Sequence, residues 1–543
     1  MSAVTTFETH PDRYVHFKLG VEGAIARLVL DVQQDRPHVD GYALKLNSYD
    51  LGVDIELHDA ALRLRFEHPG VRAVVVSSAN PRVFCAGANI MMLASSSHPF
   101  KVNFCKFTNE TRCAIEEASA RSSQRWIAAL GGTASGGGYE LALACDEIHL
   151  VDDGSSAVSL PEIPLLGVLP GTGGLTRLVD KRRVRRDLAD VFSTLAEGVK
   201  ARRALEWGLV DAVWPKSRFE RAIADRAATL AAQGTGREGP GIVLEPLAPR
   251  VSEDAVEYDH VDLRVDRSRR VAHLTVRAPS RPPGPAGMPR DSDFWMLRVF
   301  RELDDALCRL RFDFLEVGLV LVRTTGDIDS VLATEALVAS RRSDDWLARE
   351  IVLLAGRTLR RLEATAKSFF ALVEPGSAFA GCLFELALAC DRIYMLRDPA
   401  RPTHLAVGPF SGGSLPMANG LTRLESRFLG SPERAAGLAQ ARPTLDAAGA
   451  LEAGLCTSAP DEIDWDDEVR VAIEERSSLS PDALTAMEAS LRFAGPETTE
   501  TKIYGRLSAW QNWVFTRPNS TGDRGALSLY GSPERPRFDW RRT

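Results

Sequence analysis

Residues 135–146 read SGGGYELALACD, and residues 380–391 read AGCLFELALACD. The shared ELALACD starts at Glu140 and again at Glu385, so the two stretches lie 385 − 140 = 245 residues apart. The tetrapeptide LTRL that starts at Leu175 also recurs, 246 residues further along the chain. Because several matches at a near-constant offset are the signature of an internal repeat, we predict that a unit of about 245 residues is duplicated.

Each copy of the repeat alternates short apolar runs with amphipathic runs. Apolar runs of this length predict buried strands, and apolar residues at helical spacing predict the helices between them. Strands that alternate with helices are typical of an α/β fold with crossover connections. In the first copy the expected strands are 24–30, 71–76, 126–130 and 147–151, and the expected helices cover 53–64 and begin at Tyr139.

The predicted domain organisation follows from the repeat and from one stretch rich in Gly and Pro. Residues 233–250 lack apolar periodicity and are therefore predicted to be linker. After the second copy, Ser480 as N-cap and Pro481 at the first helical position predict a further helix. The expected domains are a catalytic unit over 1–232, a linker over 233–258, a degenerate second unit over 259–475 and a C-terminal helical extension over 476–543.

The composition is that of a globular protein with a small negative charge. The 543 residues carry a formal net charge of −7 without a basic block, which argues against nucleic acid as a partner. The apolar runs are too short to span a bilayer, and the N-terminus has no apolar signal region. Eight scattered cysteines without a CxxC pair predict reduced thiols in the cytoplasm. The histidines lack metal-site spacing and no P-loop occurs, so we expect no metal and no nucleotide cofactor.

Two glycine-containing loops in the first copy follow expected strands. They read FCAGAN at 84–89 and GGGYE at 136–140. Glycine lets the backbone approach a ligand, and a helix N-terminus adds partial positive charge. Two such loops that face each other could supply two N–H donors to one oxygen, which is the requirement for an oxyanion hole. The structural alternative is that the glycines only permit tight turns.

One glutamate ends this second loop, and another follows it. Glu140 lies in the first turn of an expected helix, where a glutamate usually stabilises the helix dipole. Glu162 lies between a Leu-Pro pair and a long apolar run, so its carboxyl group is expected to be partly buried, which would raise its pKa. Two carboxylates in unlike environments can divide the acid and base roles of a reaction.

Four motifs in this order resemble the crotonase, or enoyl-CoA hydratase/isomerase, superfamily. The resemblance implies an α/β fold of ββα spiral units and a CoA thioester substrate, with no cofactor beyond the CoA of the substrate. It also implies that the backbone N–H groups of Ala88 and Gly137 hold the thioester oxygen, and that Glu140 and Glu162 are the catalytic acid/base pair. The motifs are VFCAGANI at 83–90, SGGGYELALACD at 135–146, SLPEIPLLGVLPGTGGLTRL at 159–178 and ARRALEWGLVDAV at 201–213.

The second copy departs from this pattern. Its counterpart of the first loop reads SVLATE at 330–335 and has no glycine, and Cys382 stands where the first copy has Gly137. Glu385 keeps the position of Glu140, whereas Gly408 stands at the position of Glu162. We therefore expect a copy that is retained for structure and does not catalyse the same reaction.

The whole chain resembles a ring-cleaving lyase branch of the superfamily. The segments that carry this likeness, and that simple hydratases lack, are 40–62, 101–112 and 506–519. The resemblance implies hydrolysis of the 2,3-epoxide of benzoyl-CoA, or of the equivalent dihydrodiol, to 3,4-dehydroadipyl-CoA semialdehyde and formate. Neither metal, oxygen nor nicotinamide would be consumed. The expected partners are the aromatic acyl-CoA, water and a second copy of the chain in a homodimer.

Other residues and other functions stay open. The segment 101–112 is expected to form a pocket wall, with Asn103, Cys105, Asn109 and Glu110 as polar candidates, and Lys45 is a candidate for the CoA phosphates. One alternative is a 2-enoyl-CoA hydratase on a duplicated scaffold. Another is a non-catalytic protein that binds CoA thioesters. A third is a thiol-dependent acyltransferase that uses Cys105 or Cys85.

Overall fold

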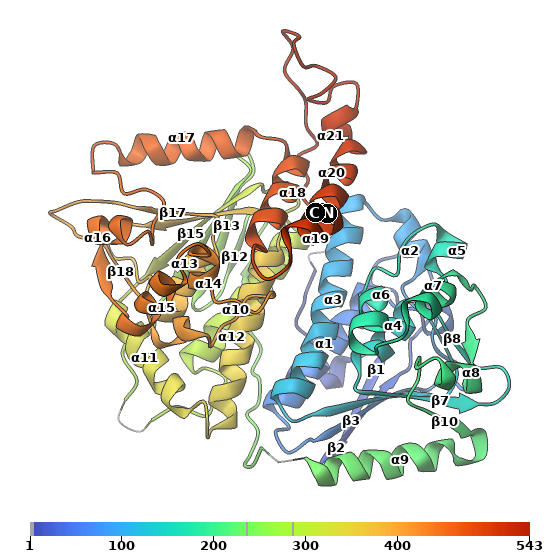
Figure 1. Cartoon of the computed structure of the whole chain (residues 1–543). Coiled ribbons are helices and arrows are strands. Elements are labelled where there is room, and N and C mark those ends of the chain that lie inside the picture. The colour runs from blue at the N-terminus through green and yellow to red at the C-terminus, as the bar shows by residue number, and fades with distance from the viewer. Residues whose placement is uncertain (1–4, 235–236, 285–286) are drawn as a thin grey trace. The chain divides into compact units, whose positions relative to one another are not determined.

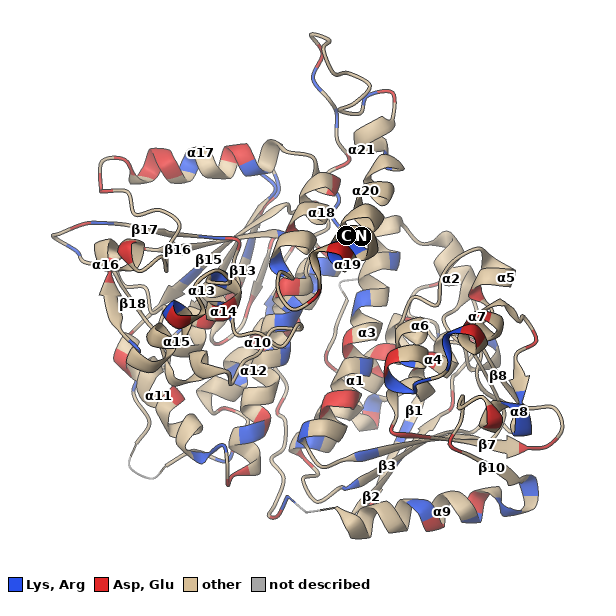
Figure 2. Cartoon of the chain, in the orientation of Figure 1, with Lys and Arg blue, Asp and Glu red and all other residues tan. Residues whose placement is uncertain are grey.

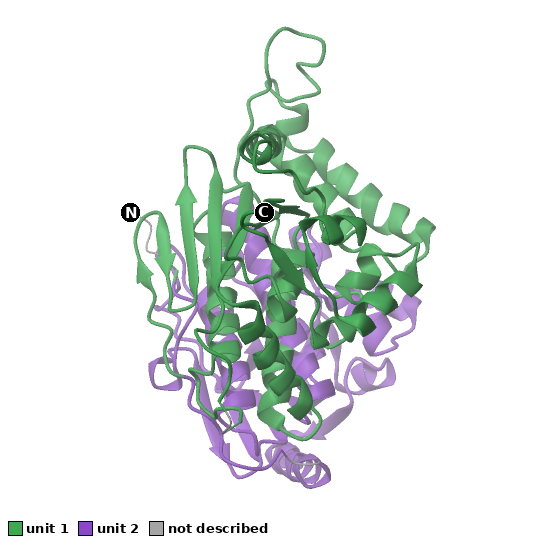
Figure 3. Ribbon diagram, turned by 90° about the vertical axis from the view of Figure 1, so that its left-hand side faces the viewer, with its two compact units in different colours: residues 1–5, 245–543 green, residues 6–244 purple. Residues whose placement is uncertain are grey.

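The computed structural model describes residues 5–234, 237–284 and 287–543. The chain divides into two compact units, which Figure 3 colours separately. The N-terminal unit comprises residues 6–244 and contains the first copy of the repeat. The C-terminal unit comprises residues 245–543, together with Thr5, and contains the second copy and everything after it.

The N-terminal unit is built on a six-stranded sheet with the order β1-β2-β3-β5-β7-β10. The strand β1 is antiparallel to β2, and every other neighbouring pair is parallel. The apolar run at 73–76 is buried throughout, as expected for a strand with both faces of the sheet covered. The strands are β1 (Phe17–Glu22), β2 (Ile25–Leu30), β3 (Ala73–Ser78), β5 (Arg125–Leu130), β7 (Glu147–Asp152) and β10 (Ala212–Pro215).

Helices cover the sheet of the N-terminal unit (Figure 1). The last of them, α9 (Lys216–Gln233), places Phe219, Ile223 and Ala227 against the apolar side chains of β3 and β5. The other helices are α1 (Leu51–Phe66), α2 (Ile90–Ser95), α3 (His98–Arg121), α4 (Gly137–Ala144), α5 (Glu162–Leu166), α6 (Gly174–Thr176), α7 (Arg186–Thr194) and α8 (Ala201–Glu206). A second, smaller sheet has the order β4 (Val83–Cys85), β6 (Thr133–Ser135), β8 (Ala157–Ser159) and β9 (Val199–Lys200).

The C-terminal unit repeats this plan and confirms the predicted duplication. Its sheet has the order β11-β12-β13-β14-β15-β16-β17, in which β13 to β17 correspond to β1, β2, β3, β5 and β7. The strands are β11 (Arg250–Val251), β12 (Ala255–Glu257), β13 (Val261–Asp266), β14 (Val271–Arg277), β15 (Leu319–Thr325), β16 (Ser368–Val373) and β17 (Arg392–Met395). A two-stranded sheet pairs β18 (His404–Ala406) with β19 (Thr444–Asp446).

The helices of the C-terminal unit follow the same order. The helix α17 packs on the sheet through Trp465, Ala472 and Ile473, as α9 does in the N-terminal unit. The helices are α10 (Trp295–Phe312), α11 (Ile328–Arg341), α12 (Trp346–Ala364), α13 (Gly381–Leu388), α14 (Arg423–Arg427), α15 (Pro432–Ala441), α16 (Ala447–Glu452), α17 (Trp465–Ser478), α18 (Pro481–Arg492), α19 (Thr499–Lys502), α20 (Ser508–Phe515) and α21 (Pro518–Thr521).

The aspartate that ends ELALACD has the same structural role in both copies. The carboxylate of Asp146 accepts a 2.7 Å hydrogen bond from the backbone N–H of Trp126 at the start of β5. Asp391 accepts the equivalent bond, at 2.8 Å, from Phe369 in β16. Each aspartate therefore ties the end of a helix to the neighbouring strand, which explains why this part of the motif recurs in a copy with a different site.

Two of the predicted boundaries differ from the structure. The linker expected over 233–258 contains β11 and β12, because β12 pairs with β13 and β11 pairs with β12, which widens the second sheet; residues 235 and 236 lie outside the described residues. The extension after residue 476 is part of the C-terminal unit. Its helix α18 begins after the predicted N-cap Ser480, and Arg492 near its end pairs with Asp391 at 2.7 Å.

The surface carries charges of both signs. Figure 2 shows Lys and Arg interspersed with Asp and Glu along α9 and α17, and Arg470 pairs with Glu474 one turn away at 3.1 Å. All eight cysteines lie within the described residues and are free thiols. Among the described residues, no helix combines the length and the apolar character needed to cross a membrane.

Candidate active site

Three parallel strands of the small sheet end at one edge, and each is followed by a predicted site residue. The strand β4 leads into the loop with Ala88, β6 leads into Gly137, and β8 leads into Glu162. The pairs β4–β6 and β6–β8 are both parallel. Since parallel strands end at the same edge of a sheet, the fold brings three segments that are far apart in the sequence to one place.

The two glycine loops touch, which explains their glycines. Gly87 has a φ of +89°, and a Cβ added there would lie 2.8 Å from the backbone nitrogen of Gly137. A Cβ on Gly138 would lie 2.3 Å from the carbonyl oxygen of Cys85. Both distances are too short for any side chain, so these positions require glycine for the close approach of the loops as well as for the turn.

Backbone hydrogen bonds set the direction of the Ala88 N–H group. The N–H of Tyr49 donates to the carbonyl of Gly87 at 3.0 Å, and the N–H of Asn89 donates to the carbonyl of Tyr49 at 2.8 Å. The N–H of Ala88 belongs to the same peptide plane as the Gly87 carbonyl and points the opposite way, away from the backbone of Tyr49. Gly137 is the first residue of α4, so its N–H is not used by the hydrogen bonds of the helix.

Glu140 is buried and held by one loop. Its side chain accepts three hydrogen bonds: from the N–H of Thr172 at 2.9 Å, from the N–H of Gly174 at 2.7 Å and from the Thr172 hydroxyl. Arg177 holds this loop in turn, because it donates to the Thr172 carbonyl at 2.8 Å and pairs with Glu116 at 2.9 Å. The PGTGG and LTRL motifs together therefore fix the position of the Glu140 carboxyl group.

Glu162 has a different environment. Its Oε2 is buried and has no hydrogen-bond partner among the described residues. Burial, and then the negative charge of Glu140, raise the pKa of Glu162 to about 7. Gly136, at φ +53°, leaves room for this carboxyl group, because a Cβ there would lie 2.6 Å from Glu162 Oε1. The site therefore holds two interacting carboxyl groups, one fully bonded and one close to half-protonated at neutral pH.

The predicted pocket wall is the helix α3. The side chain of Asn109 donates to the carbonyls of Cys105 and Gly171, each at 3.0 Å, and so ties α3 to the loop that holds Glu140. Burial and the charge of Glu140 raise the pKa of Cys105 to about 11, and burial raises that of Cys85 to about 12. Both thiols are therefore neutral at pH 7, which weighs against the acyltransferase alternative.

Asn103 and Glu110 lie on the same helix, and Asn103 is buried. Lys45 is exposed, in the segment that precedes α1. No contact in the structure assigns any of these three residues to a ligand, and their roles stay predictions.

The second copy contains a buried glutamate that the sequence comparison missed. A Cβ on Gly381, the counterpart of Gly136, would lie 2.4 Å from Glu335 Oε2, and one on Gly408 would lie 2.3 Å from Glu335 Oε1. Glu335 on α11 thus occupies the place that Glu162 has in the first copy. Burial, partly offset by a hydrogen bond from Phe410, raises its pKa to about 8. The expectation that this copy keeps only one of the two carboxylates was wrong, because the second one comes from a different element.

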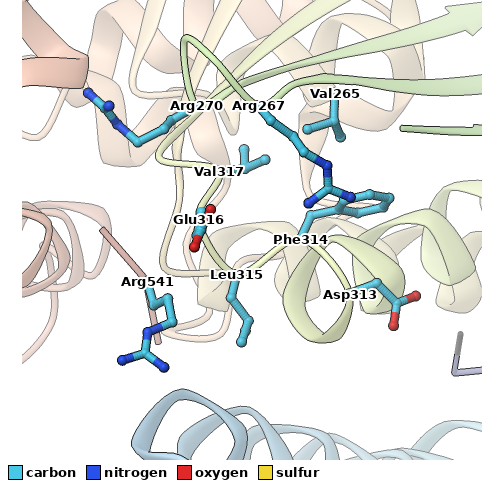
Figure 4. A pocket seen from close by; sticks show the side chains of 9 residues that line it. All are labelled: Val265, Arg267, Arg270, Asp313, Phe314, Leu315, Glu316, Val317 and Arg541. Atoms are coloured by element: carbon cyan, nitrogen blue, oxygen red, sulfur yellow. The ribbon is translucent and has the colours of Figure 1, made fainter. Parts of the chain in front are cut away.

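Figure 4 shows a pocket of the C-terminal unit with a volume of about 210 Å³. It is smaller than is usual for a ligand site. Two of its arginines are already engaged, because Arg267 pairs with Asp254 at 2.5 Å and Arg270 stacks on Trp540 at 3.8 Å. The pocket includes none of the predicted site residues.

Comparisons with known proteins identify the family of the chain. Residues 29–237 match the family described as Enoyl-CoA hydratase/isomerase. The chain is 50% identical over 547 residues to benzoyl-CoA-dihydrodiol lyase of Aromatoleum evansii, a match that covers 100% of this chain and 98% of that relative. The chain belongs to the benzoyl-CoA-dihydrodiol lyase family. It is therefore a crotonase-superfamily lyase that acts on a CoA thioester.

Other relatives match only part of this chain. The fatty acid oxidation complex subunit alpha of Shewanella loihica is 38% identical over 149 residues, which are 27% of this chain and 20% of that relative. A solved enoyl-CoA hydratase from Geobacillus kaustophilus is 36% identical, covers 40% of this chain and 75% of its own, and has a TM-score of 0.36.

The sequence predicted four site residues, and it did not point to the residues that hold them in place. Ala88, Gly137, Glu140 and Glu162 lie at the strand ends and loops described above. Thr172 was not singled out, although the four glycine and proline neighbours in PGTGG signal a tight loop near the site. The segment of Tyr49 was noted only as foreign to simple hydratases.

Proposed function

We propose that the enzyme cleaves the ring of 2,3-epoxybenzoyl-CoA, or of the equivalent dihydrodiol, to 3,4-dehydroadipyl-CoA semialdehyde and formate. Atom balance for the epoxide requires the uptake of two water molecules. The observation that carries the proposal is the paired Glu140 and Glu162 beside the glycine loops, in a chain that matches a named benzoyl-CoA-dihydrodiol lyase from end to end.

The N–H groups of Ala88 and Gly137 would hold the thioester oxygen. The two loops that carry them are in contact; the N–H of Ala88 points away from the backbone of Tyr49, and the N–H of Gly137 is not used by the hydrogen bonds of α4. In this arrangement the carbonyl draws negative charge from the ring as its bonds rearrange. Loss of one such donor typically lowers the rate about 10²- to 10³-fold, so this term is a large part of the catalysis.

The environments of the two glutamates divide their roles. The carboxyl group of Glu140 is fixed by hydrogen bonds from Thr172 and Gly174, so it is suited to orient the attacking water and accept its proton. Glu162, with a pKa of about 7 and a free oxygen, can give a proton to the oxygen that leaves the ring carbon and take one back. Both steps use groups of the chain and water, and we expect no further cofactor.

The surface beside the site suits an apolar acyl group. Ile90 and Met91 follow Ala88, and Leu165 and Leu169 follow Glu162; their exposures of 54%, 64%, 64% and 65% are high for such side chains. Exposed apolar side chains that follow site residues in this way favour contact with a ligand or a partner. We propose an aromatic acyl-CoA as the ligand, a homodimer as the assembly and the cytoplasm, which suits free thiols, as the location.

The test offers 2,3-epoxybenzoyl-CoA and crotonyl-CoA in parallel to the purified enzyme and to the variants Glu140→Gln and Glu162→Gln. We expect release of formate from the epoxide by the wild type, with its loss in both variants, by enzymatic formate assay and mass spectrometry. Hydration of crotonyl-CoA without formate would overturn the proposal and leave a 2-enoyl-CoA hydratase. Binding of both thioesters without turnover would leave a CoA-thioester-binding protein.

A further inference from the structure

Tyr49 is fixed rigidly beside the glycine loops. Its backbone makes both hydrogen bonds that hold Gly87 and Asn89, and the next residue, Asp50, is the N-cap of α1. The ring packs on Phe104 with a centroid distance of 5.9 Å, and the guanidinium carbon of Arg112 lies 5.2 Å from the ring centre. The position of the hydroxyl group is therefore determined by the fold on several sides.

The hydroxyl group of Tyr49 makes no hydrogen bond to any of the described residues. The residue is 3% exposed, and its Oη is buried without a hydrogen-bond partner among the described residues. Folded proteins rarely leave such a group unbonded, because burial removes its hydrogen bonds to water and nothing replaces them. An unbonded hydroxyl of this kind is a reason to look for a ligand that accepts its hydrogen bond.

The hydroxyl lies against Gly137, in the part of the site where the thioester oxygen is proposed to bind. A Cβ added to Gly137 would lie 2.1 Å from Tyr49 Oη, so the oxygen lies directly against the residue whose N–H group is one of the two proposed donors. Burial, against the opposing charge of Arg112, raises the pKa of Tyr49 well above its usual value of 10. The phenol is thus a permanent hydrogen-bond donor at neutral pH and does not act as a base.

The second copy provides an internal comparison. Position 295 corresponds to position 49 at the offset 295 − 49 = 246, and it holds a tryptophan. The indole N–H of Trp295 donates to the carbonyl of Arg277 at 2.9 Å, so its polar atom is satisfied inside the protein. The aromatic ring at this place is common to both copies, whereas the unbonded hydroxyl occurs only in the copy with the glycine loops.

We infer that the Tyr49 hydroxyl is a third donor to the thioester oxygen of the substrate, beside the N–H groups of Ala88 and Gly137. This inference rests on the proposed function, since it assumes a thioester carbonyl at that place. It makes Tyr49 a catalytic residue whose hydrogen bond strengthens as negative charge collects on the oxygen.

The test uses Tyr49→Phe, which removes only the hydroxyl, and Tyr258→Phe as a matched control. Tyr258 is also buried, but it lies in the C-terminal unit and its hydroxyl donates to the carboxylate of Asp305 at 2.5 Å, so its loss should lower the stability of that unit without changing the rate. For Tyr49→Phe we expect kcat for formate release to fall about 10²-fold with little change in KM and no loss in the urea midpoint. A second readout is the ¹³C shift of enzyme-bound benzoyl-CoA labelled at the carbonyl carbon, which does not depend on turnover.

Hydrogen bonds to the carbonyl move this ¹³C signal downfield, and we expect Tyr49→Phe to move it back toward the value of free benzoyl-CoA. The inference is overturned if the variant keeps both the wild-type signal and the wild-type rate. If the wild type binds benzoyl-CoA and shows the Tyr49-dependent shift but releases no formate, the proposed reaction fails while the assignment of Tyr49 stands. A Tyr49→Phe enzyme with reduced kcat but an unchanged shift would also overturn it, because the hydroxyl would then act elsewhere.

Discussion

The two glutamates that we propose as the catalytic pair should affect stability with opposite signs. Burial raises the pKa of Glu162 from 4.5 to about 7. Because this carboxyl group has a higher pKa in the folded than in the unfolded protein, its contribution to the unfolding free energy is fully present below about pH 4.5 and is lost as the pH rises through about 7. At about 1.4 kcal/mol per pKa unit, ionised Glu162 costs the N-terminal unit about 3 kcal/mol at pH 8. Glu162→Gln removes this cost.

Replacing Glu140 should have the opposite effect on the stability of the N-terminal unit. Its carboxylate accepts three hydrogen bonds from Thr172 and Gly174, and glutamine can replace them only in part. We expect Glu140→Gln to lower the unfolding free energy by about 1–3 kcal/mol at both pH 5 and pH 8. Glu162→Gln should raise it by about 3 kcal/mol at pH 8 and by less than about 1 kcal/mol at pH 5. Formate release should be lost in both variants.

Hydrogen exchange followed by mass spectrometry measures these differences in the full-length enzyme. Peptides from β5 and α4 report the opening free energy of the N-terminal unit, while peptides from β16 in the C-terminal unit serve as the internal control. A Glu162→Gln protein that is no more stable than the wild type at pH 8 would refute the reasoning. It would mean that Glu162 is solvated in the resting enzyme, and the division of roles between the glutamates would then lose its physical basis.

Three further changes test the supports of the site. Gly136→Ala places a methyl group 2.6 Å from Glu162 Oε1 at a φ of +53°, so we expect kcat to fall about 10²-fold. The circular dichroism spectrum should stay unchanged, which would show that the variant is folded. Arg177→Met releases the Thr172 carbonyl, and initial-rate kinetics should show kcat reduced about tenfold with KM changed less than about twofold. Glu335→Gln should leave the rate of formate release unchanged. In the wild type the raised pKa of Glu335 lowers the unfolding free energy by about 1.4 kcal/mol per pH unit between about pH 5 and 8, and hydrogen exchange in β16 should show that the variant lacks this pH dependence.

The sequence predicted the elements that depend on local pattern and missed those that depend on contact between distant segments. The strands, the helix α4 and the duplication follow from apolar periodicity and from ELALACD, and all three are confirmed. The strands β11 and β12 were assigned to a linker, because two- and three-residue strands carry almost no periodic signal. Their existence depends on the edge of β13, which only the folded sheet provides.

The same distinction applies within the site. Ala88, Gly137, Glu140 and Glu162 lie in motifs, so a resemblance could locate them. The unbonded hydroxyl of Tyr49 could not be predicted, because whether a buried hydroxyl finds a hydrogen-bond partner depends on the packed structure and not on the neighbouring sequence. Arg177 could be noted as part of a repeated LTRL, but its hold on the Thr172 carbonyl depends on Glu116 in α3.

Glu335 shows that a pair of buried glutamates occurs in both copies of the repeat. Both copies place a carboxyl group against a glycine with positive φ, and in both burial raises its pKa. In the second copy Gly408 and Gly381 enclose Glu335, which is 0% exposed, and its neighbour Glu385 pairs with Arg423 at 3.2 Å. Glu162 instead starts a short helix whose next residues are exposed. Exposed neighbours beside the carboxyl group, together with a glycine loop, are what distinguish the copy that we propose to be catalytic from the other.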